Sequence, residues 1–103
     1  MSLSAAAVVE ASARRLFPNL SLDQVMVELL LERAQKNLIK YQAMARHFEA
    51  KYGQDFKTFR QAILCSEPTL EVEQDYFDWE LAVTGVSDMK EEIERLRALS
   101  EPA

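Results

Sequence analysis

The longest uninterrupted pattern in the chain runs from Ser21 to Tyr52 and contains neither glycine nor proline. Its apolar residues recur at alternating steps of four and three, which is typical of a helix that packs against another long helix. They are Val27, Leu31, Ala34, Leu38, Tyr41, Ala45, Phe48 and Tyr52. A helix of about 30 residues is roughly 45 Å long. A compact domain of this size has a radius of gyration of only about 13 Å. The sequence therefore predicts an elongated hairpin.

A second pattern of the same kind predicts the other arm of the hairpin over residues 69–99. Apolar residues again step by four and three, and the stripe then drifts toward a period of 3.6. They are Val72, Tyr76, Trp79, Val83, Val86, Met89, Ile93 and Leu96. Gly85 interrupts this helix at a cost of about 1 kcal/mol.

Two shorter helices complete the predicted fold. Ser4 can cap a helix over 4–16, which has to stop before Pro18. Asp55 can cap a helix over 55–65. The chain has only two glycines and three prolines, which favours few, long elements. We therefore expect an all-α chain with one helical domain over 1–103. Its predicted helices cover 4–16, 21–52, 55–65 and 69–99.

Charge and composition narrow the classes of partner. The net charge of −5 disfavours direct binding to nucleic acid, where contacts to phosphate dominate the affinity. It suits a protein with a basic surface. The single cysteine, Cys65, excludes a disulfide within the chain and favours a reducing compartment. The N-terminus lacks the basic start of a signal peptide, and no apolar run is long enough to span a membrane. We expect a cytoplasmic protein.

No catalytic or metal-binding group can be assembled from the sequence. His47 is the only histidine, and no carboxylate lies three or four residues from it, so metal-ligand spacing is absent. A nucleophilic Cys65 would need His47 as its base. Carboxylate-bridged metal sites in helical bundles use Glu-x-x-His motifs, which the chain lacks. We expect no enzyme activity, no metal and no cofactor.

Six acidic residues and no basic residue occupy positions 67–80. They can stabilise the N-terminus of the predicted helix through its dipole. They can also form a docking face for a basic protein, because Glu71, Asp75 and Asp78 recur on one side of the helix. Tyr76 and Trp79 could then act as aromatic anchors. The candidate partner-binding residues are Glu71, Asp75, Asp78, Tyr76 and Trp79.

Aromatic residues are expected to fill the core at the closed end of the hairpin. They are Tyr41, Phe48, Tyr52, Phe56, Phe59, Tyr76, Phe77 and Trp79.

The start of the long helix over 21–52 is too apolar for one hairpin partner to cover. Residues 22–31 are apolar on most sides, and the alanine-rich helix before them offers little volume. A twofold-related copy is the simplest cover, because such dimers are the commonest assembly. We predict a homodimer that uses Leu22, Met26, Leu29 and Leu30.

One part of the chain resembles a known family. Arg46-His-Phe-Glu-Ala-Lys-Tyr-Gly-Gln-Asp-Phe-Lys-Thr-Phe is followed by Glu71-Val-Glu-Gln-Asp-Tyr-Phe-Asp-Trp-Glu-Leu-Ala-Val. These stretches are similar to a "FEKKYG-x-x-F-x-x-F … E-V-E-x-D-Y-x-E-W-E" pattern in a family of small, uncharacterised bacterial and archaeal helical proteins. The resemblance covers residues 38–99 and leaves 1–30 outside.

The resemblance implies an antitoxin-like protein that neutralises a small toxin encoded alongside, and it implies no catalytic residue. We therefore predict a non-enzymatic protein-interaction module, with a basic toxin as the partner. The alternative is a helical adaptor or a homo-oligomeric scaffold.

Overall fold

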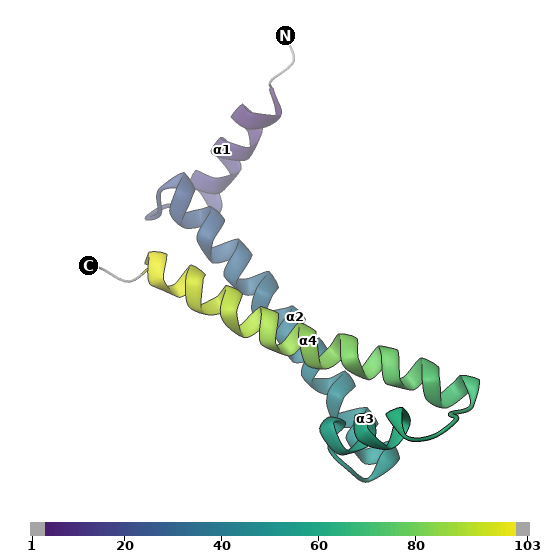
Figure 1. The fold of residues 1–103 in the computed structure, drawn as a ribbon. Coiled ribbons are helices and arrows are strands. Elements are labelled where there is room, and N and C mark those ends of the chain that lie inside the picture. The colour runs from purple at the N-terminus through teal and green to yellow at the C-terminus, as the bar shows by residue number, and fades with distance from the viewer. Residues whose placement is uncertain (1–3, 101–103) are drawn as a thin grey trace.

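A computed structural model describes residues 4–100, which form four helices and no strand (Figure 1). The helices are α1 (Ala5–Leu16), α2 (Leu22–Tyr52), α3 (Phe56–Leu64) and α4 (Leu70–Ser100). Every helix begins and ends within one residue of its predicted range. The all-α fold and the hairpin of two long helices are thus confirmed.

Side-chain caps explain where the helices start. The oxygen of each N-cap side chain accepts a hydrogen bond from a backbone N–H three residues later, and these residues are Ser4, Ser21, Asp55 and Thr69. At Ser21 the bond is reciprocal, because Gln24 Oε1 also accepts from the Ser21 N–H at 2.8 Å. At the end of α2, Gly53 adopts a left-handed conformation with φ of 61°, which glycine enters without steric cost.

The helices build an elongated molecule. α2 and α4 run side by side in opposite directions, α3 closes one end of the hairpin, and α1 points away from the other end (Figure 1). We call the end with α3 the closed end and the end with α1 the open end. The radius of gyration is 20.2 Å and the extents are 63 × 39 × 19 Å. A compact chain of this length would have a radius of gyration of about 13 Å.

Two buried clusters hold the hairpin together. Near the open end, Ala34 of α2 packs against Ile93 and Leu96 of α4. At the closed end, Trp79 of α4 packs between Phe48 of α2 and Phe59 of α3. The predicted stripe on α2 is confirmed, since all eight of its residues are buried or half-buried.

The two long helices approach each other between these clusters, and here the predicted stripe on α4 is wrong at one position. Val83 is 38% exposed, whereas Ala82 is fully buried. Gly85 is also buried, and a Cβ built on it would lie 2.6 Å from ring carbons of Tyr41. The small residues Ala82 and Gly85 therefore face α2 and leave room for the Tyr41 ring.

The closed-end aromatic cluster contains six of the eight predicted rings. Trp79 is its centre, with ring centroids 5.0 Å from Phe59 and 5.8 Å from Phe48. Tyr41 instead packs at Gly85. Phe77 is 55% exposed, so its prediction as a core residue was wrong. It follows Tyr76 directly and so projects from the other side of α4.

Candidate functional site

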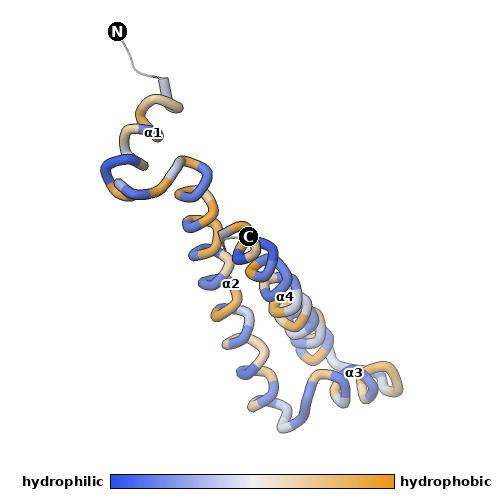
Figure 2. Tube along the Cα trace, turned by 90° about the vertical axis from the view of Figure 1, so that its left-hand side faces the viewer, coloured by the Kyte–Doolittle hydropathy of each residue, from blue (hydrophilic) through white to orange (hydrophobic). Residues whose placement is uncertain are grey.

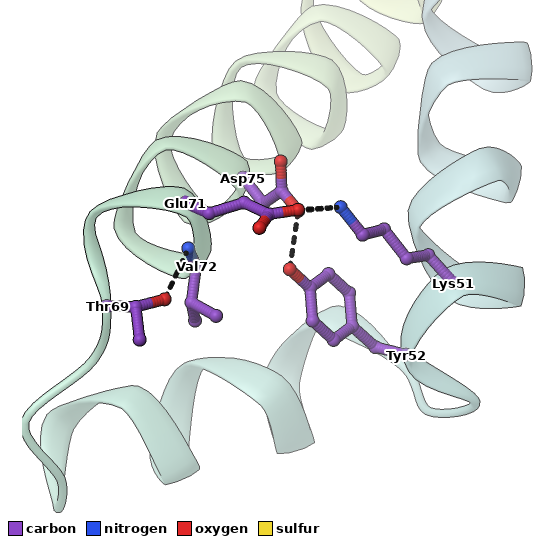
Figure 3. Close-up of polar contacts among 6 residues, drawn as sticks. All are labelled: Lys51, Tyr52, Thr69, Glu71, Val72 and Asp75. Carbon is purple, nitrogen blue, oxygen red and sulfur yellow. Dashed lines mark hydrogen bonds and ion pairs between the residues drawn. The ribbon is translucent and has the colours of Figure 1, made fainter.

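Side chains of α2 bind part of the predicted acidic docking face (Figure 3). The Asp75 carboxylate accepts hydrogen bonds from Lys51 Nζ at 2.6 Å and from the Tyr52 hydroxyl at 2.5 Å. Lys51 Nζ also lies 3.2 Å from Glu71 Oε1. Lys51 is in the last turn of α2, and Glu71 is in the first turn of α4. Each charge therefore also suits the dipole of its own helix.

The pKa values of this group follow from its contacts. The hydrogen bonds from Lys51 and Tyr52 lower the pKa of Asp75, and the bond to Asp75 raises the pKa of Lys51. Burial and the bond to Asp75 raise the pKa of Tyr52. Each group is thus held in the charge state that binds its neighbours. The arrangement links the ends of α2 and α4, and it leaves Asp75 only 14% exposed to a partner.

The other predicted partner-binding residues are also engaged within the chain, to different degrees. Asp78 accepts a hydrogen bond from Gln74 at 3.0 Å. Tyr76 is half-buried and stacks on Phe56 at 5.7 Å, and a hydrogen bond with Glu80 raises its pKa.

Trp79 is fully buried, so its prediction as a surface anchor was wrong. It occupies the stripe that packs on α2 and α3. Its indole N–H has no hydrogen-bond partner within residues 4–100.

A different surface of α4 is exposed. Leu70, Phe77 and Leu81 are 86%, 55% and 57% exposed, and they recur at steps of seven and four along the side opposite Trp79. Glu73 and Glu80 lie along one flank of these residues, and both are exposed. We call these five residues the α4 outer face. It combines apolar contact area with carboxylates and is not covered by any other part of residues 4–100.

The sequence analysis did not identify Phe77 and Leu81 as residues of a contact surface, although the sequence contains a signal for this role. Neither residue falls on the predicted stripe of α4, so the periodicity places both of them on the solvent side. Large apolar residues on a solvent side, with carboxylates beside them, are the pattern that indicates a contact surface.

A second exposed apolar surface lies at the open end. The four residues predicted to form a dimer, Leu22, Met26, Leu29 and Leu30, are 45–51% exposed. Val8, Val9 and Leu16 of α1 continue the surface. We call these seven residues the open-end surface. Figure 2 shows hydrophobic segments alternating with hydrophilic ones along α1 and the first turns of α2.

The remaining candidate groups belong to neither surface. His47 is exposed, with its ring edge-on to Phe48. Cys65 is an exposed free thiol at the end of α3. Within residues 4–100 no three His, Cys, Asp or Glu side chains are grouped so that they could hold a metal ion. None of the four helices combines the length and the apolar character needed to cross a membrane, as judged over the same residues.

A scan against protein-family models found no match for the chain, and searches of curated proteins and of solved structures found none either.

Proposed function

We propose that this chain is a non-enzymatic protein-interaction module that binds a basic protein through the α4 outer face. The observation that carries the proposal is the exposure of Phe77 and Leu81 beside Glu73 and Glu80. Burying a large apolar side chain contributes about 1.5–3 kcal/mol. A partner that covers Phe77 and Leu81 removes their side chains from water, and this burial favours the complex.

The charges around this face select the kind of partner. Residues 41–85, which form the closed half of the hairpin, carry eight acidic and four basic side chains. Lys51 and Arg60, the basic side chains near the start of α4, face Asp75 and Tyr76. The carboxylates of Glu73 and Glu80 favour Lys and Arg on the partner, which raises the association rate and orients the encounter. The same charges repel the phosphates of a nucleic acid.

The backbone that carries this face belongs to a helix that is already packed before binding. The inner side of α4 packs into the aromatic cluster, and Asp75 is bound to Lys51 and Tyr52. Preorganisation of this kind reduces the entropy lost on binding. A protein that neutralises a toxin by occupying its basic active site needs a rigid acidic surface of this kind. We propose this role for the α4 outer face, in place of the side carrying Asp75.

Copurification with the product of the adjacent reading frame tests the proposal. With the wild-type chain tagged, we expect the neighbouring protein to copurify. Phe77→Ser with Leu81→Ser should weaken this complex by at least about 30-fold, because even a single hot-spot residue contributes 2 kcal/mol or more. Glu73→Lys should weaken it further and reduce its dependence on salt.

Two matched variants serve as controls. Ile39→Ser with Leu64→Ser removes equally exposed apolar side chains elsewhere, and Glu94→Lys makes the same charge change near the other end of α4. Both should leave the complex intact. Equal effects of test and control variants would refute the proposed face. If the neighbour binds but does not arrest growth when expressed alone, the chain is an adaptor and not an antitoxin.

A further inference from the structure

The open-end surface forms a groove that residues 4–100 leave unfilled. α1 and α2 diverge from the turn between them (Figure 1), and of their facing side chains only Ala13 and Val25 are buried. Apolar side chains line the cleft between the two helices, among them Val9, Leu16, Leu22, Val25, Met26 and Leu29. A groove of this kind fits an amphipathic helix laid between its walls.

The groove continues to the end of the hairpin. A second hollow, which also touches Met26, is lined by the apolar residues Leu20, Val27 and Leu99. Its polar lining consists of Asp23, Gln24 and Glu28. Leu99, in the last turn of α4, is 72% exposed. Uncovered apolar side chains therefore extend from α1 over the first turns of α2 to the last turn of α4, with polar residues of α2 between them at Leu99.

We propose that a second copy of the chain fills this groove, with α1 and the first half of α2 from each copy interlocking around a twofold axis into a four-helix assembly. This inference does not depend on the proposed function, because it uses a different surface and needs no other protein. The exposed area is large enough. Eight large apolar side chains at about half exposure provide on the order of 400 Å² of apolar area per copy. About 65% of a homodimer interface is apolar. Each copy would therefore bury roughly 600 Å², near the lower limit for a stable complex.

Charge favours a second copy over a charged partner at this end. Tyr41 lies opposite Gly85, so the open half of the hairpin consists of residues 4–40 and 86–100. This half carries eight basic and eight acidic side chains and is neutral, whereas residues 41–85 carry a net charge of −4. Two copies can meet at their open ends without repulsion between like charges. The acidic closed ends repel each other, so the two hairpins should point in opposite directions.

Sedimentation equilibrium with the full chain tests the dimer. At tens of micromolar we expect twice the 11.8 kDa mass of one chain. Leu29→Glu with Leu30→Glu should shift the mass to that of one chain while circular dichroism still reports a helical protein. The matched variant Ile39→Glu with Leu64→Glu changes two exposed apolar residues outside the surface and should remain dimeric. A wild-type monomer, or loss of the dimer in both variants, would overturn the proposal.

The native cysteine tests the arrangement independently of any change at the interface. Cys65 is exposed and lies at the closed end. With a spin label on Cys65, the two labels of a dimer joined at its open ends should be farther apart than the 63 Å length of one chain. A shorter separation would place the contact elsewhere and refute the arrangement.

Discussion

At the scale of single residues, we expect Asp75 to make the stability of the hairpin depend on pH. Its pKa is lowered by hydrogen bonds from Lys51 and Tyr52, so the unfolded chain binds this proton more readily than the folded chain. The stabilisation is present above the ordinary pKa of about 3.9 and is lost as the pH falls through the folded-state value. Lys51 and Tyr52 have raised pKa values, so their contributions are lost as the pH rises above about 10.

We predict that Asp75→Asn lowers the free energy of unfolding at pH 7 by about 1 kcal/mol, the net contribution of a typical hydrogen bond. It should also make the loss of stability toward acid pH shallower, because the group with the lowered pKa is gone. Urea unfolding at pH 7 and at several lower values measures both effects. The exposed Asp88 is the matched position. An equal loss on Asp88→Asn, or an unchanged acid limb, would contradict the role of Asp75.

At the scale of the elements, the sequence predicted the helices and their ends well because their signals are local. Ser21, Gln24 and Gly53 fix the limits of α2 through contacts within a few residues. The alternating steps of four and three likewise identify the packing side of α2 without knowledge of its partner.

The misassignment of Trp79 arose from treating neighbours in sequence as neighbours in space. Trp79 is flanked by Asp78 and Glu80, but residues one apart on a helix point in different directions. The same periodicity that predicted α4 placed Trp79 in the core and excluded it as a surface anchor.

Two further features depend on the register between helices, which no local pattern contains. The pairing of Lys51 with Asp75 requires the end of α2 to lie beside the second turn of α4. The sequence also does not indicate that Ala82 and Gly85 face α2, because small residues contribute little to a hydrophobic pattern. Their role becomes clear only from the Tyr41 ring that they accommodate.

We predict that Gly85→Ala destabilises the hairpin by about 1 kcal/mol, although alanine is the better helix former. The new Cβ would overlap the Tyr41 ring, and overpacking of 1–3 kcal/mol exceeds the helix-propensity gain of about 1 kcal/mol. Thermal unfolding measures the change. Ser87→Ala, at an exposed position of the same helix, should not destabilise. In a double-mutant cycle, Tyr41→Leu should remove most of the penalty. Additive losses would show that the ring is not the cause.

At the scale of the whole molecule, the two ends of the hairpin differ in charge and in the apolar surface that they expose. The near-neutral open end carries the uncovered apolar groove, and the acidic closed end carries the rigid aromatic cluster and the start of the α4 outer face. The length of α2 and α4 separates these two regions (Figure 1). Changes at one end should therefore leave the other end intact.

We predict that the Leu29→Glu, Leu30→Glu variant is an extended monomer in solution. Small-angle X-ray scattering should give a radius of gyration close to 20.2 Å, because the variant retains the closed-end core that holds α2, α3 and α4 together. The wild-type dimer should give a larger value. A value near the 13 Å of a compact chain would show that the hairpin has collapsed.

The 63 Å length of the chain has a consequence for valency. In the proposed dimer, two hairpins joined at their open ends would display two copies of the α4 outer face, one near each end of a rod. Monomeric targets can then bind the two faces independently, and each binds no more tightly than it would bind a single hairpin. A target that repeats its own binding surface gains avidity only if its spacing matches that of the rod. In that dimer the length of α2 and α4 would set the spacing between the two faces, so inserting or deleting heptads would change which repeating targets are captured.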